Sequence, residues 1–175
     1  MRPAVFFDRD GTLNEEVGYA GRVEDFHIFG FTPQAVRLVN QAGLAAVVVT
    51  NQAGVGRGYF DSTAVESLHR ILRERLREAG ASLDGIYYCP HAPDGGCECR
   101  KPQPGMVRQA ARELDLDLER SWVIGDRCHD VALAHAVGAR GVLVRTGYGG
   151  RESGQCPVDF EAANALEAVE WILKQ

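Results

Sequence analysis

The chain has 175 residues, of which 45% are hydrophobic and 25% are charged, and its formal net charge is −5. This length suits one domain over residues 1–175, able to bury about 68 to 70% of the surface that the unfolded chain exposes. The acidic balance argues against nucleic-acid binding, and no apolar run approaches the roughly 20 residues of a membrane span. The N-terminal stretch turns acidic too soon for a signal peptide. We expect a cytoplasmic protein, monomeric and without a membrane partner.

Short apolar runs alternate along the chain with segments of helical periodicity. In chain order, strands are predicted from the runs AVFF, LAAVVVT, GIYYC, SWVIGD and GVLVRTG. Helices are predicted over residues 32–43, 61–80, 104–116, 130–139 and 162–175. Strand followed by helix, repeated, predicts an α/β fold: a Rossmann-like parallel sheet with helices on both faces.

The predicted helix over residues 61–80 shows both its start and its buried face. Asp61 or Ser62 can cap its N-terminus. Its apolar side chains recur at helical spacing, which predicts packing against the core, and they are Val65, Leu68, Ile71, Leu72 and Leu76.

The polar residues at the strand ends are the candidates for chemistry, because ligands of open α/β sheets bind at the carboxyl ends of the strands. Asp8 and Asp10 follow the first strand, and Gly11 permits a tight bend. Two carboxylates at this spacing can divide nucleophilic attack and proton transfer between them, and the alternative for the D-x-D pair alone is an acidic turn or helix cap. A calcium loop is excluded, because an EF-hand counted from Asp8 needs Gly and Glu where this chain has Leu13 and Tyr19.

Further candidates follow the later strands. Thr50 precedes a Gly-rich turn that could hold phosphoryl oxygens, although the Lys-Ser or Lys-Thr of a Walker loop is missing. Arg100 and Lys101 stand just before a predicted helix and supply two cations. Asp126 ends a strand and Asp130 follows one helical turn later, which suits Mg²⁺ held by hard oxygen ligands.

Three of the five cysteines and one histidine crowd into the stretch CPHAPDGGCECRKPQPGM. Their spacing, C-x-H-x₅-C-x-C, offers the donor set of a closed structural Zn²⁺ site, and the residues are Cys89, His91, Cys97 and Cys99. Such a site would fix Arg100 and Lys101, which follow directly. A metal-free loop, oxidation to a disulfide and an iron site are the alternatives. Cys128 and Cys156 stand apart and are expected to be ordinary thiols.

Taken together, the motifs FFDRDGT, VVVTN, RKP and GDRCHD, each after a predicted strand, resemble those of the haloacid dehalogenase superfamily of phosphohydrolases. The resemblance covers nearly the whole chain and implies Asp8 as nucleophile and Asp10 as general acid and base. It implies that Thr50 and Lys101 neutralise the transferring oxygens. Catalytic Mg²⁺ would be held by Asp8, Asp126 and the backbone carbonyl of Asp10. No long insertion follows the first two motifs, so no separate cap domain is expected.

Within this superfamily, the zinc loop makes the chain similar to the D-glycero-D-manno-heptose 1,7-bisphosphate 7-phosphatase family, close kin of histidinol-phosphate phosphatases. This implies a Mg²⁺-dependent phosphatase that acts through an aspartyl phosphate on a phosphorylated sugar and supplies heptose for lipopolysaccharide or another surface glycan. The resemblance also implies a set of substrate contacts, which are Glu16, Val17, Gly18, Tyr19, Asn51, Gln52, Ala53, Arg100 and Arg127.

Two features depart from the family pattern. Arg127 stands after Asp126 where the family usually has lysine, so the cation is kept but its reach differs. The zinc loop is short, with five residues between His91 and Cys97, which leaves the anomeric preference open.

Three other functions compete with the heptose bisphosphatase. Histidinol phosphatase needs the same phosphoryl chemistry, and Glu15 and Glu16 near the pocket rim could attract its cationic substrate. A non-catalytic zinc-containing module that binds phosphorylated ligands would gain nothing from crowding Asp8 and Asp10 beside an anion. A DNA-end phosphatase lacks the basic groove that it would need.

Overall fold

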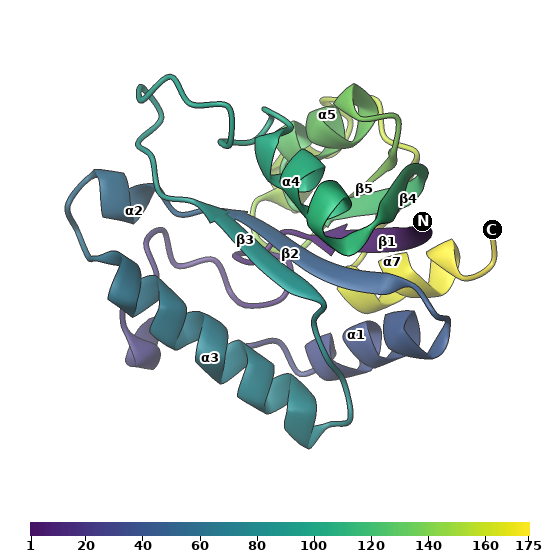
Figure 1. The fold of residues 1–175 in the computed structure, drawn as a ribbon, viewed down its shortest axis with the longest axis horizontal. Helices are drawn as coiled ribbons and strands as arrows, with labels where there is room; N and C mark the ends of the chain where they lie inside the picture. Colours follow the sequence, from purple (N-terminus) through teal and green to yellow (C-terminus); the bar gives the residue numbers. More distant parts are fainter.

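The strands of the protein form one six-stranded parallel sheet, seen in the computed structural model, which describes residues 1–175 (Figure 1). Their spatial order is β3-β2-β1-β4-β5-β6. The strands are β1 (Arg2–Phe7), β2 (Ala45–Asn51), β3 (Gly85–Cys89), β4 (Leu116–Gly125), β5 (Arg140–Val144) and β6 (Phe160–Ala162). The predicted parallel α/β fold is confirmed, and its strand order reverses beside β1, where such sheets bind ligands.

The central strands are buried on both faces of the sheet. In β1, Val5 and Phe7 belong to one apolar cluster, Ala4 and Phe6 belong to another, and none of the four has exposed surface. A strand that must pack on both sides cannot alternate apolar with polar residues. This is why the strands read in the sequence as continuous apolar runs.

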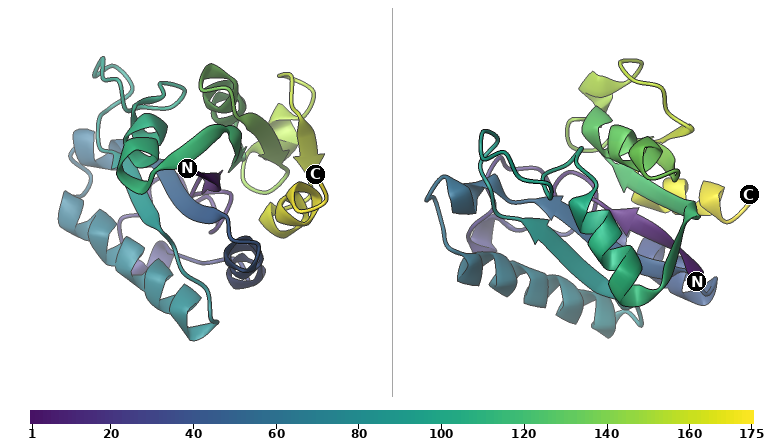
Figure 2. Two further views of the ribbon diagram at one scale, coloured as in Figure 1. Left: turned by 45° about the vertical axis from the view of Figure 1, so that its right-hand side comes forward. Right: turned by 45° about the horizontal axis from the view of Figure 1, so that its top comes forward.

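Helices cover both faces of the sheet, as Figure 2 shows. On one face lie α1 (Thr32–Gln41), α3 (Ser62–Glu78) and α7 (Ala165–Ile172), and on the other lie α4 (Gly105–Leu114) and α5 (Cys128–Ala136). The predicted cap of α3 is confirmed, because the Asp61 side chain accepts a hydrogen bond from Ala64 N at 3.0 Å. Leu68, Leu72 and Leu76 of its apolar stripe pack into the core.

Several elements differ from the prediction. Two short helices, α2 (Ala53–Gly56) and α6 (Gly149–Glu152), a 3-10 turn (Val23–Asp25) and strand β6 lie in segments that carry no clear periodicity. The helix predicted to reach residue 116 ends at Leu114, because Asp115 takes a left-handed conformation with φ 53°. The chain then enters β4 at Leu116 rather than at Ser121. None of the helices combines the length and apolar character that a membrane crossing requires.

Candidate active site

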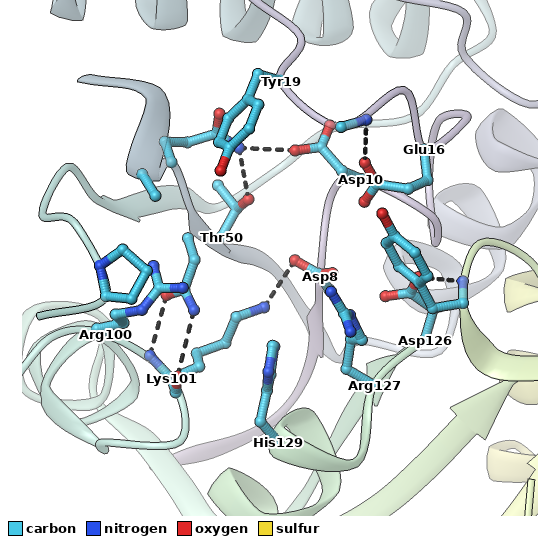
Figure 3. A pocket seen from close by; sticks show the side chains of 16 residues that line it. Asp8, Asp10, Glu16, Tyr19, Thr50, Arg100, Lys101, Asp126, Arg127 and His129 are labelled. Atoms are coloured by element: carbon cyan, nitrogen blue, oxygen red, sulfur yellow. Dashed lines mark hydrogen bonds and ion pairs between the residues drawn. The ribbon is translucent and has the colours of Figure 1, made fainter. Parts of the chain in front are cut away.

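The carboxyl ends of the central strands meet in one polar pocket with a volume of about 210 Å³ (Figure 3). Only three of its 16 lining residues are hydrophobic. The residues predicted for catalysis and for Mg²⁺ all line it: Asp8, Asp10, Thr50, Lys101 and Asp126. The topology therefore brings together positions that lie more than 100 residues apart in the chain.

Most of the predicted substrate contacts line the same pocket. They are Glu16, Gly18, Tyr19, Asn51, Gln52, Ala53, Arg100 and Arg127. Val17 does not line it, and this residue is 45% exposed. The predicted substrate contact of Val17 therefore has no support from the pocket geometry.

Asp8 lies at the centre of the pocket, directly after β1. Its Oδ1 accepts a hydrogen bond of 2.7 Å from Lys101 Nζ, which lies 2.7 Å from Asp130 Oδ1 as well. Burial raises the pKa of Asp8 to about 7, although the Lys101 charge opposes this. Burial disfavours the Lys101 charge too, but the carboxylates of Asp130 and Asp8 raise the pKa of Lys101 above its ordinary value. Lys101 is therefore a permanent cation in a buried position.

A crowded acidic cluster surrounds the base of the pocket. One oxygen from each of Asp8, Asp126 and Asp130 lies within 4.8 Å of the others. Burial and the nearby Asp8 carboxylate raise the pKa of Asp126 to about 9. Buried oxygen donors that repel one another favour a divalent cation, so the residues present fit Mg²⁺.

Two glycines let the chain approach Asp126 closely. At Gly11 (φ +83°) and Gly147 (φ +58°), an added Cβ would lie 2.2 and 2.1 Å from Asp126 Oδ2. The same oxygen accepts a hydrogen bond of 2.8 Å from the backbone N–H of Tyr148. Both positions must therefore be occupied by glycine, because any larger residue would displace the Asp126 carboxylate.

Asp10 is held by donors from three side chains. Arg9 contacts both carboxylate oxygens at 3.0 to 3.1 Å, and Asn14 and Gln52 each donate at 2.8 Å. Although burial opposes ionisation, the Arg9 charge and these hydrogen bonds hold the pKa of Asp10 below its ordinary value. Gln52 Nε2 also donates to Thr50 Oγ1 at 2.9 Å, so one amide connects the ends of β1 and β2.

Arg9 and His69 were not predicted as site residues. Arg9 is fully buried, and its Nη1 lies 3.2 Å from Nε2 of His69 on α3. Burial and the Arg9 charge lower the pKa of His69 to about 3, so the neutral ring accepts the arginine N–H. The arginine within the DRDGT motif was a visible signal, but nothing in the sequence connects it to a helix some 60 residues later.

The Cys and His side chains of the predicted zinc site come together in the loop after β3. The ligand atoms of Cys89, His91, Cys97 and Cys99 lie within 4.8 Å of one another. Sulfur and imidazole donors in this number fit a structural Zn²⁺. The loop is also joined to the active site, because Gln52 N donates to Cys89 O at 2.8 Å.

Asn51 fixes the backbone that carries the two predicted cations. Its Oδ1 accepts a hydrogen bond of 3.0 Å from Lys101 N, and its Nδ2 donates to Lys101 O at 3.3 Å. Asn51 therefore holds Lys101 in place across the end of β2, in addition to lining the pocket.

Three further residues line the pocket without having been predicted: Pro93, His129 and Tyr148. His129 lies within the GDRCHD motif, between the predicted acidic residues Asp126 and Asp130. Tyr148 follows β5, so its place after a strand end was the available signal.

Cys128 and Cys156 form a disulfide, with 5.8 Å between their Cα atoms. The prediction that both are ordinary thiols is wrong. Cys128 is the first residue of α5 and Cys156 lies in the loop after α6, 28 positions later, and the folding of α5, β5 and α6 brings them together. The disulfide closes its loop beside Arg127, at the edge of the pocket.

The disulfide should contribute measurably to stability. Replacing both Cys128 and Cys156 by Ser removes the constraint on the unfolded chain, so we expect the free energy of unfolding to fall by about 3 kcal/mol. Urea unfolding without reductant measures this, with the same comparison in strong reductant as the control, where the difference should vanish. Equal stability of the two proteins without reductant would contradict the expectation.

Asp130 is expected to act through Lys101. It is fully buried, pairs with Lys101 Nζ at 2.7 Å and accepts a hydrogen bond of 3.1 Å from Arg127 N. Asp130→Asn removes half of the charge that faces the lysine, and we expect kcat/KM for a phosphate monoester to fall about 10- to 100-fold. Asp25→Asn, which breaks the exposed pair with Arg22, is the control and should leave kcat/KM unchanged. An Asp130→Asn enzyme as active as the wild type would contradict this role.

The fold and the acidic strand ends have the organisation of haloacid dehalogenase-like hydrolases. The HAD-hydrolase-like family model matches residues 98–168. The D-glycero-D-manno-heptose-1,7-bisphosphate 7-phosphatase of Thermosynechococcus vestitus is 43% identical, covering 98% of this chain and 95% of that protein. The corresponding β-heptose enzyme of Escherichia coli K12 is 40% identical, with coverage of 98% and 88%.

Among solved structures, the D,D-heptose 1,7-bisphosphate phosphatase of B. bronchiseptica, complexed with magnesium and phosphate, has a TM-score of 0.91. It is 32% identical and the match covers 99% of both chains. The chain belongs to the D-glycero-D-manno-heptose 1,7-bisphosphate 7-phosphatase family, and it is a phosphoric monoester hydrolase.

Proposed function

We propose that the protein removes the 7-phosphate of D-glycero-D-manno-heptose 1,7-bisphosphate, in the synthesis of heptose for surface glycans. The observation that carries this proposal is the placement of cations in the pocket. Lys101 faces Asp8 at the centre, while Arg100 and Arg127 lie on either side (Figure 3). A substrate with two phosphates can place one at Asp8 and meet an arginine with the other. The names of the relatives support the same substrate.

Asp8 acts as the nucleophile in the proposed reaction. One of its oxygens attacks phosphorus, a P–O bond forms to Asp8, and the bond to the sugar oxygen breaks. Lys101 holds the other carboxylate oxygen and, with Thr50, neutralises the transferring oxygens. Bound Mg²⁺, held by Asp8, Asp126 and the Asp10 carbonyl, would supply the charge that lets an anionic substrate approach these carboxylates.

Asp10 moves the protons. It gives one to the leaving sugar oxygen, and its carboxylate then takes one from the water that attacks the aspartyl phosphate and releases inorganic phosphate. Its donors hold it ionised in the free enzyme. Asp10 therefore takes up this proton from solvent when the substrate binds, because a dianionic phosphate nearby raises the pKa of a carboxyl group.

Arg100 is the proposed contact for the second phosphate. Its Nη1 is buried and has no hydrogen-bond partner within the protein, although the residue lines the pocket. A buried donor without a partner is costly, and an anionic oxygen of the ligand would satisfy it. Zinc at the preceding cluster would fix this arginine, because Cys99 directly precedes it.

We also propose that the enzyme works as a monomer in the cytoplasm. The three free thiols of the cluster suit a reducing compartment. There the Cys128–Cys156 disulfide is expected to exchange with its reduced form.

Histidinol phosphate is the second candidate substrate, and Glu16 favours it. This carboxylate lines the pocket and could attract a cationic amine. Phosphate release with Mg²⁺, compared for both anomers of the heptose bisphosphate and for histidinol phosphate, distinguishes the two. We expect kcat/KM to favour one anomer of the bisphosphate, whereas a preference for histidinol phosphate would overturn the proposed substrate.

A further inference from the structure

Arg127 is held from one side by the segment that follows β5. Its guanidinium carbon lies 3.9 Å from the centre of the Tyr148 ring, and its Nη1 lies 3.3 Å from Oε1 of Glu152. The arginine side chain is 40% exposed and lies at the edge of the pocket. The stacking on Tyr148 and the ion pair with Glu152 together fix the orientation of the Arg127 guanidinium.

The segment that holds Arg127 is itself firmly attached. Glu152 accepts a hydrogen bond from the backbone N–H of Cys128, the first residue of α5. The Cys128–Cys156 disulfide ties the chain after α6 to the same point. Tyr148 N donates to Asp126 at 2.8 Å. Helix α6 is therefore held in a fixed position relative to α5 and to the acidic cluster.

An arginine fixed in this way can still bind an anion. Its guanidinium offers five N–H donors, and Glu152 takes only one of them. Free arginine loses much rotamer freedom when it binds, and a stacked, paired arginine has already lost it. The remaining donors stay at the pocket edge, where the part of a substrate beyond the transferred phosphate would lie.

We propose that Tyr148 and Glu152 are positioning residues that hold Arg127 for an anionic group of the substrate other than the phosphate transferred to Asp8. Helix α6 is then part of the specificity apparatus of the enzyme. The inference rests on the proposed function in one respect, namely that the substrate carries a second phosphate.

The test compares KM for heptose bisphosphate with KM for p-nitrophenyl phosphate, whose single anionic group must occupy the transfer site. Tyr148→Leu and Glu152→Gln are each expected to raise KM for the bisphosphate about fivefold, and to raise KM for p-nitrophenyl phosphate much less. Tyr148→Phe keeps the ring and should restore most of the affinity lost in Tyr148→Leu. Glu78→Gln, which removes an exposed Arg–Glu pair on α3, is the matched control.

Two outcomes would overturn the inference. One is an unchanged KM for the bisphosphate in both variants with melting temperatures like that of the wild type. The other is an equal rise of KM for both substrates, which would assign Arg127 to the transferred phosphate. Failure of the proposed function has a different signature, because the wild-type enzyme itself would then show no preference for the bisphosphate over the monoester.

Discussion

Asp8→Asn is expected to lower kcat for every phosphate monoester by about 10⁴-fold or more. The amide is nearly isosteric but has no anionic oxygen to attack phosphorus. It also leaves Lys101 paired with Asp130 alone. Phosphate release from p-nitrophenyl phosphate in Mg²⁺ is the simplest measurement, because this substrate needs nothing beyond the transfer site.

Two comparisons make the Asp8→Asn result specific. Asp10→Asn should lose about 10² to 10⁴ in rate on a sugar phosphate, because only the proton transfer is removed. Asp25→Asn, in an exposed ion pair, should behave as wild type. An Asp8→Asn enzyme within tenfold of the wild type would mean that another group, or water itself, attacks phosphorus.

Loss of one cluster cysteine is the second change with a large expected effect. Cys89 is fully buried at the end of β3, and its Sγ contacts His91 Nδ1 and Cys97 Sγ at 3.5 Å. We expect the Cys89→Ser protein to be purified without the one zinc ion per chain that the wild type is expected to bind, because a neutral hydroxyl replaces a thiolate ligand. The loop that carries Arg100 and Lys101 then loses its anchor, so kcat/KM should fall about 10- to 100-fold.

Zinc content and activity must be measured together. The double variant Cys128→Ser, Cys156→Ser removes the other two cysteines and should keep its full zinc content, since neither lies in the cluster. A Cys89→Ser protein that retains zinc would show that the other three residues suffice. A zinc-free protein with full activity would contradict the role of the cluster in placing Arg100 and Lys101.

The sequence predicted which residues meet in the pocket, because they stand at the carboxyl ends of strands. Asp8, Thr50 and Asp126 directly follow apolar runs that could only be buried strands. In a parallel sheet such ends share one edge, so the topology alone brings them together. The Cys and His cluster was equally visible, because its four residues lie within eleven positions of the chain.

The residues that the sequence did not reveal depend on contacts between distant segments. His69 reaches Arg9 from the middle of α3, where a histidine on a mostly apolar face carries no signal of its own. The Cys128–Cys156 disulfide depends on where α6 turns back against α5, and no motif marks that turn. Tyr148 supports Arg127 only because β5 places the two loops side by side.

The most direct test of the proposed chemistry is to trap the phosphorylated enzyme. In Asp10→Asn, p-nitrophenyl phosphate can still transfer its phosphoryl group, because its leaving group needs no proton, but the general base for hydrolysis is missing. Acid quench within a turnover, followed by peptide mass spectrometry, should find one phosphoryl group on the peptide that contains Asp8. The same experiment on the double variant Asp8→Asn, Asp10→Asn should find none. Rapid phosphate release without any labelled peptide, or label on a residue other than Asp8, would contradict the account.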